Sequence, residues 1–475
     1  MRGTVIDLAI LTIAKLAVSG FTLLVGFRAV SDDDYARVVI AQGFARAPTL
    51  DPSGTSWLPA PFWILGGAMR VFGRALWVAQ VQAVALGVLA MWIVYAAGSW
   101  IARDRRVALV GALIACATSW SAMLGVSTVP ELPTAALVLL AMASVAAMEP
   151  GRVVVGGAAL LLACLSRYEP WFVAIPFAAY AASGAWRAPS HRARGLYVLG
   201  AGLAVIGPVG WILWNHHAHG APLAFLASVS DYNEAVAPAS TLRRLGTYAY
   251  AGLRAEPELI ALTAVLVSSL TRASRAAAWD RFARPAWMSA FLFVALTAAN
   301  VKGGAPTHHP ERALVAPLLA VGLLAGRALT ELVRAPREIA RRLRVAVVAV
   351  AAASWPARRF VLRSEVLADR ALEVDIGERA AARVAPAVKV HVDVVDYGYF
   401  AVLAATGRPE DFIPNEGRDL GGLGLPAVAT DGLAAAVESG LPYAIVRASS
   451  APRRASPLEK NDAWALLDVR AAITD

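Results

Sequence analysis

The sequence predicts an α-helical polytopic membrane protein with about eleven spans and a small α/β domain at its C-terminal end. The 475 residues are 58% hydrophobic and 16% charged, whereas an average soluble domain has about 25% charged residues. Apolar runs of spanning length recur up to about residue 355. Basic residues collect in the short segments between these runs, which is typical of cytoplasmic membrane loops.

The bulk composition also excludes several other classes. The net charge of +10 is explained by the membrane loops, so we expect no nucleic-acid partner. The only cysteines, Cys116 and Cys164, lie inside apolar runs, which argues against a disulfide framework or a cysteine-rich metal site. The N-terminal apolar segment is longer than the core of a signal peptide. We interpret it as the first span, within which Lys15 must face other helices or extend toward the interface.

Spanning helices are assigned where an apolar run approaches the roughly 20 residues that a bilayer requires. The longer candidates are 8–27, 76–100, 107–124, 131–148, 195–214 and 312–330. Shorter candidates, which need tilt or neighbouring residues to cross, are 152–166, 169–183, 257–270, 286–300 and 343–355.

The connections between these spans alternate in charge. If the N-terminus is cytoplasmic, the cytoplasmic connections are all basic: 102–106, 149–152, 186–194, 271–284 and 334–344. The outer connections contain acidic and aromatic residues, and the longest are 28–75 and 215–256. The alternation predicts a multi-pass protein of the bacterial inner membrane. It divides the chain into a membrane module, 1–355, and a periplasmic domain, 356–475.

The C-terminal segment has the composition of a small soluble domain. Residues 388–395 alternate between apolar and polar, as in a strand. The segments 442–448 and 463–470 read as further short strands, and 363–385 reads as a helix. Glycine and proline separate these pieces. The whole segment has enough residues, about 110, to bury a modest core of its own.

The first outer connection, 28–75, has the features of a loop that covers a cavity at the membrane surface. Asp32, Asp33 and Asp34 follow the first span directly. Proline and glycine turns come next, and then an aromatic stretch containing Trp57 that we expect to lie along the outer interface. Charged residues at the non-cytoplasmic membrane boundary are functional candidates by default.

Polar residues at the other outer helix ends point to the same face. These candidates are Glu131, Arg167, Tyr168 and Glu169, and, before the late span 312–330, Lys302, His308, His309 and Arg312. They supply a carboxylate base and cationic groups for a phosphate. The histidines at 216, 217 and 219 are a weaker candidate for a metal site, since adjacent histidines seldom bind one ion and no acidic or cysteine ligand completes the set.

The segment "SDDDYARVVIAQ" at 31–42, with "VPELP", "SRYEP" and "HHPERALVAP" further on, resembles the GT-C glycosyltransferases. The branch that looks most similar contains protein O-mannosyltransferases and aminoarabinose transferases. The resemblance implies inverting transfer of a sugar from a polyprenyl-phosphate donor to an acceptor, which could be a glycan, a lipid or a protein. Asp33 takes the place of the general base, with Asp34 beside it and Asp32 still a candidate.

The same resemblance assigns roles to the other residues. Cationic residues would hold the donor phosphate: Arg167, Lys302, His308, His309 and Arg312. Tyr35, Trp57, Glu131, Tyr168 and Glu169 would line the cavity. No cofactor is certain, but two of the aspartates could hold a divalent cation, for which hard oxygen ligands select Mg or Mn.

Simpler interpretations remain open at this stage. One aspartate could cap a helix that begins at Tyr35, and Arg167 could form an ion pair with Glu169 or Glu131. A multi-span transporter or lipid flippase would also suit the number of spans. A third alternative is an assembly protein that acts through its C-terminal domain and would need no acidic cluster in the first outer loop.

Overall fold

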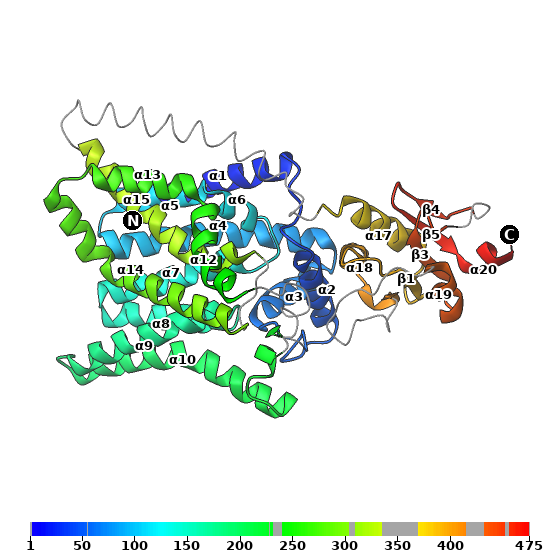
Figure 1. The fold of residues 1–475 in the computed structure, drawn as a ribbon, viewed down its shortest axis with the longest axis horizontal. Helices are drawn as coiled ribbons and strands as arrows, with labels where there is room; N and C mark the ends of the chain where they lie inside the picture. The colour runs from blue at the N-terminus through cyan, green and yellow to red at the C-terminus, as the bar shows by residue number, and fades with distance from the viewer. Residues whose placement is uncertain are drawn as a thin grey trace.

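The structure is a computed structural model, and it describes residues 2–54, 56–227, 229–230, 240–303, 309–334, 369–414, 432–451 and 456–474. The predicted span 343–355 and His308 lie outside these residues. An elongated helical bundle forms one part of the molecule and the C-terminal α/β region forms the other, with α2 (Asp33–Arg46) and α3 (Ala60–Phe72) between them (Figure 1).

The helices of the bundle follow the apolar runs of the sequence. They are α1 (Arg2–Leu24), α4 (Leu76–Ala102), α5 (Arg105–Cys116), α6 (Ser119–Leu124), α7 (Glu131–Ala147), α8 (Pro150–Cys164), α9 (Glu169–Trp186), α10 (His191–His219), α12 (Thr241–Ala255), α13 (Pro257–Ser268), α14 (Arg272–Val301), the 3-10 helix η1 (Pro310–Leu314) and α15 (Val315–Arg334).

The membrane class is confirmed, whereas the number of spans stays a prediction. Within the described ranges, α1, α4, α10, α14 and the continuous segment Pro310–Arg334 are long and apolar enough to cross a bilayer. Shorter apolar helices of 10–17 residues are α3, α7, α8 and α13. The predicted boundaries were wrong at 271–284, because this basic connection is the first half of α14.

The predicted span 107–124 is two helices, α5 and α6, and Lys15 of α1 bonds to the second of them. The Lys15 side chain is fully buried, and its Nζ donates to the carbonyl of Ser121 at 2.6 Å. The positive charge of Lys15 thus lies beside the C-terminal end of α6, where the helix dipole favours a cation. Lys15 therefore faces other helices, which was one of the two predicted alternatives.

The close approach of Lys15 to Gly125 gives a prediction about stability. A Cβ at position 125 would lie 2.0 Å from Lys15 Nζ and 2.8 Å from the Ser121 carbonyl oxygen. We expect Gly125→Ala to destabilise the protein by about 1–3 kcal/mol, as overpacked cores are. Thermal unfolding in detergent would measure this. Gly210→Ala is the control, because nothing lies within 4 Å of its Cβ, and an equal loss there would contradict the prediction.

The centre of the bundle is α7, which is buried on almost all sides. It packs against α4, α8, α14 and α15, and its apolar residues belong to the main hydrophobic core. A helix that is apolar on every face belongs in the interior of a bundle. Its first residue is Glu131, so this carboxylate is carried into the interior at one end of the bundle.

The C-terminal region contains α17 (Ala371–Arg383), β1 (Val390–Val392), α18 (Tyr399–Thr406), the 3-10 helix η2 (Pro409–Asp411), β2 (Phe412–Pro414), α19 (Gly432–Ser439), β3 (Tyr443–Arg447), β4 (Glu459–Lys460), β5 (Trp464–Asp468) and α20 (Val469–Thr474). The sheet order is β2-β1-β3-β5-β4. Strand β1 is parallel to β2 and β3, while β5 is antiparallel to β3 and β4. The predicted small α/β fold is thus confirmed.

Both faces of this sheet are covered, which explains why its strands alternate less than predicted. Ile445 and Leu466 lie in the core that includes α17 and α18. Their neighbours Ala444 and Leu467 lie in a second core that includes Ala436 of α19. Strands that are buried on both faces read as continuous apolar runs.

The C-terminal region docks on the first outer connection. Helix α18 packs on α2 through an apolar cluster that contains Val38, Ala41 and Ala401. The amide of Gln42 donates to the carbonyls of Arg74 and Ala404, both at 2.8 Å. The predicted division near residue 355 lies outside the described residues. The contact surface between the two parts is the face of α2 that contains Val38 and Ala41.

Candidate active site

Charged side chains from four places in the sequence converge at one end of the bundle. We call Asp33, Glu131, Arg167, Glu169 and Arg312 the carboxylate–arginine cluster. Asp33 comes from the start of α2, Glu131 from the start of α7 and Arg312 from η1, while Arg167 and Glu169 come from the point where a turn leads into α9. The outer connections were predicted to bring these residues to one face, and ion pairs join all five of them in the structure.

Glu131 is the centre of this cluster. Its side chain is 0% exposed and accepts hydrogen bonds from Arg167 and from Arg312, whose Nε lies at 2.8 Å. Arg167 also donates through Nε to both carboxylate oxygens of Glu169, at 3.1 and 3.0 Å. The predicted ion pairs of Arg167 are therefore both present. Buried guanidinium groups held by carboxylates in this way have fixed positions.

The three consecutive aspartates have three different environments, as expected for residues about 100° apart on a helix. Asp32 accepts a bidentate pair from Arg370, with Nε at 2.8 Å and Nη2 at 2.9 Å. Asp34 is buried, while the Asp33 side chain is 44% exposed and, among the described residues, pairs with Arg312 alone, at 3.4 Å. Asp33 therefore has the most exposed carboxylate of the three, and it lies beside the buried Arg312.

Asp34 connects the first outer connection to the bundle through hydrogen bonds with Thr128. Its carboxylate accepts from the backbone N–H groups of Val30, Ser31 and Thr128 at 3.0, 3.2 and 2.9 Å. The Thr128 hydroxyl donates to the Asp34 carbonyl at 2.7 Å. Burial raises the pKa of Asp34 to about 6, and the charge of Arg312 opposes that rise.

The simple capping interpretation of the aspartates was wrong in detail. Helix α2 begins at Asp33 and not at Tyr35, and its N-cap Asp32 makes no side-chain capping bond. Asp34 instead bonds to N–H groups that precede the helix. The Asp32 carboxylate is taken by Arg370, so each member of the run has a partner of its own.

The Asp32–Arg370 pair gives a prediction about domain docking. Arg370 precedes α17, and its hydrogen bonds to Asp32 raise its pKa above the usual range. We expect Arg370→Gln to destabilise the protein by about 1–3 kcal/mol, because charge-assisted bidentate bonds that are mostly shielded from water are lost. The control is Arg379→Gln, whose pair with Asp375 is exposed and worth little. Equal shifts of the unfolding temperature for the two variants would contradict this view.

Arg37 is a member of the site that sequence reasoning missed. It is buried, and its guanidinium carbon lies 4.6 Å from the ring centre of Trp57 and 5.6 Å from that of Phe62. Burial lowers its pKa to about 10, while Glu131 and Asp33 act in the opposite direction. Its Nε and Nη1 have no hydrogen-bond partner among the described residues. The available signal was its spacing of four from Asp33, which places both on one helix face.

Three other residues predicted to line the cavity, Tyr35, Trp57 and Tyr168, do not all lie at the same place. The Tyr168 hydroxyl donates to the Ser56 carbonyl at 2.7 Å, and its ring stacks on Phe225. Trp57 stacks on Phe62. Tyr35 lines a separate cavity with Arg28, against α17. These contacts place Tyr168 and Trp57 near the roof of the site and Tyr35 on another face of α2.

The predicted phosphate-binding residues are only partly brought together. Arg167 and Arg312 belong to the cluster. His309, at φ 50°, lies edge-on to Trp120. Lys302 is exposed at the end of α14 and forms no ion pair within the described part of the chain. The prediction for His308 cannot be placed, because it lies outside that part.

The histidines at 216, 217 and 219 lie in the last turn of α10 and do not open a loop as predicted. His219 Nε2 lies 3.9 Å from a carboxylate oxygen of Asp51. Over the described ranges there is no group of three or more histidine, cysteine, aspartate or glutamate side chains placed to hold a metal ion.

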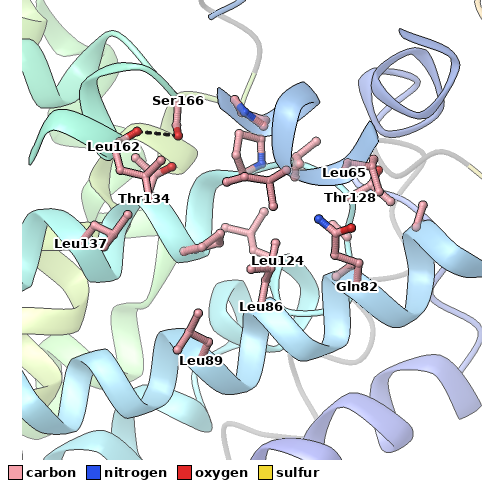
Figure 2. Close-up of a pocket in the computed structure, with 18 of the residues that line it drawn as sticks. Leu65, Gln82, Leu86, Leu89, Leu124, Thr128, Thr134, Leu137, Leu162 and Ser166 are labelled. Atoms are coloured by element: carbon pink, nitrogen blue, oxygen red, sulfur yellow. Dashed lines mark hydrogen bonds between the residues drawn. The ribbon is translucent and has the colours of Figure 1, made fainter. Parts of the chain in front are cut away.

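An apolar cavity of about 110 Å³ lies beside the cluster (Figure 2). Leu65 of α3, Leu86 of α4 and Leu137 of α7 line it. Its polar edge includes Thr128, which bonds to Asp34, and Ser166, which precedes Arg167. Charged groups and an apolar cavity thus adjoin at the same end of the bundle, as a lipid with a charged headgroup requires.

Fold and site together define a polytopic membrane protein with a charged centre at one end of its bundle and an α/β region docked over it. Residues 53–214 match the family model described as dolichyl-phosphate-mannose-protein mannosyltransferase. This range contains Glu131, Arg167 and Glu169 but neither the aspartate run nor Arg312. No curated protein matches the chain.

Solved structures show the same fold. ArnT from Cupriavidus metallidurans bound to undecaprenyl phosphate is 16% identical, with a TM-score of 0.58 and coverage of 97% of each chain. Its apo form is 17% identical, with a TM-score of 0.55 and coverage of 98% of each. The oligosaccharyltransferase of Archaeoglobus fulgidus is 12% identical, with a TM-score of 0.52, over 93% of this chain and 68% of that one. The chain has the fold of the GT-C glycosyltransferase superfamily, which confirms the predicted resemblance.

Proposed function

We propose that this chain is a membrane glycosyltransferase that moves a sugar from a polyprenyl-phosphate donor to an acceptor, with Asp33 as general base. The observation that supports this most directly is the position of Asp33. Its carboxylate is the most exposed of the run, and it lies beside buried arginines that suit a phosphate. The match to a mannosyltransferase model and the likeness to ArnT bound to undecaprenyl phosphate support the proposed class of reaction and of donor.

The proposed reaction is a single displacement with inversion. The acceptor hydroxyl or amine attacks the anomeric carbon, and the bond from that carbon to the phosphate oxygen breaks. The acceptor proton passes to Asp33. Polyprenyl phosphate leaves with its negative charge, which Arg312 and Arg37 stabilise. Nε and Nη1 of Arg37 have no hydrogen-bond partner in the described part of the chain, so a phosphate oxygen would supply the acceptor that these two donors lack.

The apolar cavity suits the isoprenoid part of the donor. It lies between α3, α4 and α7, and its polar edge adjoins the cluster through Thr128 and Ser166. A lipid phosphate with its first isoprene unit in the cavity would therefore place its phosphate toward the arginines. We propose that this end of the bundle faces the periplasm, with the protein in the bacterial inner membrane and its N-terminus in the cytoplasm, because the opposite connections are the basic ones.

We also propose that transfer needs no divalent cation at the aspartates. The Asp32 carboxylate is held by Arg370, and the Asp34 carboxylate is held by backbone N–H groups. The remaining carboxylate, Asp33, already has the cationic guanidinium of Arg312 beside it at 3.4 Å, and this positive charge disfavours a metal ion there. We expect at least about half of the transfer rate to remain after treatment with EDTA. A loss that added Mg or Mn restores would contradict this.

The test of the function is a transfer assay with membranes that contain the protein. Donors are polyprenyl phosphates labelled in a hexose or a pentose, since neither sugar nor acceptor is fixed by the site. We expect label to move to an acceptor fraction while polyprenyl phosphate accumulates. Extraction of the products into lipid, glycan and protein fractions identifies the acceptor class. Movement of the intact donor across the bilayer without cleavage would instead favour a flippase.

A further inference from the structure

A second charged region lies at the end of the bundle away from the carboxylate–arginine cluster. An open crevice of about 720 Å³ is formed there by the N-terminal ends of α1, α5 and α8 and the C-terminal end of α4. The N-terminus of α1 lies at the end of the bundle away from α2 and the C-terminal region (Figure 1). The charged end of the crevice is at the C-terminal end of α4, a helix of 27 residues that rises by roughly 40 Å, whereas the apolar cavity beside the cluster begins at Ala79, near the other end of α4.

The crevice has a charged end and an apolar wall. Arg103, Arg105 and Arg152 lie at the charged end, and Leu8, Trp92 and Ala96 form the wall. Trp92 is 38% exposed. From Trp92 to Arg103, α4 rises by roughly 16 Å. This length and this order of groups match a lipid headgroup followed by the upper part of an acyl chain.

The charges in the crevice leave one arginine without a partner. Arg105 pairs with the buried Asp7, Arg152 with Glu149, and Arg334 with Asp104. Arg103 has no ion pair or side-chain hydrogen bond within the described ranges. The lining contains three arginines and two carboxylates, so it has a single positive charge in excess.

The backbone at Arg103 provides a second, independent observation. Arg103 is the C-cap of α4 at φ 54°, and its N–H donates to the Ser99 carbonyl. This left-handed position usually contains glycine, which makes the same turn without a Cβ. The turn therefore does not require an arginine, whereas a ligand of the crevice would.

We propose that this crevice binds an anionic phospholipid through its phosphodiester group. Arg103 donates to the phosphodiester oxygens, whose single negative charge balances the excess charge of the lining. One acyl chain lies along Leu8, Trp92 and Ala96. A soluble phosphate would use the charged end but would leave this apolar wall uncovered. The site is independent of the proposed sugar transfer, and its occupant stabilises the bundle from the opposite leaflet.

The experiment compares the full-length protein in nanodiscs of phosphatidylcholine with discs that also contain phosphatidylglycerol. We expect phosphatidylglycerol to raise the unfolding temperature by a few degrees, because a ligand bound only to the folded state stabilises it. Arg103→Gln should remove most of this increase and lower the retained phosphatidylglycerol in native mass spectrometry roughly tenfold, as the loss of one charge-assisted bond implies. Arg187→Gln should keep both effects.

Arg187 is a matched control because it is another exposed helix C-cap without an ion pair in the described residues, at the end of α9 on the same side. Arg103→Gly addresses folding, since glycine suits the turn. It should unfold no earlier than the unchanged protein in phosphatidylcholine, yet gain nothing from phosphatidylglycerol. The proposal is overturned if Arg103→Gln keeps the full increase, if Arg187→Gln loses as much, or if soluble glycerophosphate produces the same increase without lipid.

Discussion

Asp33→Asn is expected to reduce sugar transfer by about 10²–10⁴-fold, the usual contribution of a general base, while the protein unfolds at nearly its normal temperature. Asparagine keeps the size and the polarity of the side chain but cannot accept the acceptor's proton. The Asp33 side chain is 44% exposed and makes one long contact with Arg312, so little stability depends on it. Initial transfer rates and thermal unfolding of the purified variant measure the two effects.

The matched variant is Asp34→Asn, in which we expect the opposite pattern. The Asp34 carboxylate accepts three backbone N–H groups from two directions. An asparagine amide turns its NH₂ toward one of these directions in either orientation, and a buried N–H without an acceptor costs about 1–3 kcal/mol. Asp34→Asn should therefore lower the unfolding temperature, and any loss of transfer should follow the loss of folded protein.

These two variants together decide the assignment. If Asp34→Asn abolishes transfer at an unchanged unfolding temperature while Asp33→Asn stays active, Asp34 is the base. If neither changes transfer, the aspartate run has no catalytic role. Asp32→Asn adds a third case, because its loss should act through the docking of Arg370 and resemble Arg370→Gln.

The sequence was sufficient to predict which end of the bundle contains the charged site, but not its internal contacts. The alternation of basic and acidic connections assigns Asp33, Glu131, Arg167 and Arg312 to one face without any knowledge of packing. That Glu131 lies between the two arginines depends on how α7, the turn before α9 and η1 pack. Residue 312 is 181 positions from residue 131, and no local pattern encodes such a contact.

The partners of two buried cations, Arg37 and Lys15, also could not be predicted from the sequence. Lys15 lies in a segment that the sequence assigns to the membrane, and Arg37 lies in the first outer connection, where nothing in the sequence marks it as buried. Their partners are an aromatic pair, Trp57 and Phe62, and the carbonyl of Ser121. Aromatic faces and helix-end carbonyls leave no charge pattern in the sequence, so the residues that satisfy a buried cation in this way appear only once the chain is folded.

Glu131→Gln is expected to be the most destabilising single change in the site. Removing one partner of a buried ion pair leaves the other charge uncompensated, at a cost of about 3–5 kcal/mol. Here Arg167 and Arg312, with side chains 15% and 6% exposed, both depend on Glu131. Without it, Arg37, Arg167 and Arg312 would face one another with fewer negative charges between them. The position of Glu131 in the first turn of α7 adds to the preference for a carboxylate there.

Glu169→Gln is the comparison that separates this effect from a general loss of charge. Glu169 is also in the first turn of its helix and also binds Arg167, but Arg167 keeps Glu131 when Glu169 is neutral. We expect its loss to be clearly smaller, about 1–2 kcal/mol. Thermal unfolding of both variants in the same detergent gives the order. An equal or larger loss in Glu169→Gln would show that the arginines are fixed mainly by Glu169, and that Glu131 is not the centre on which the phosphate-binding geometry depends.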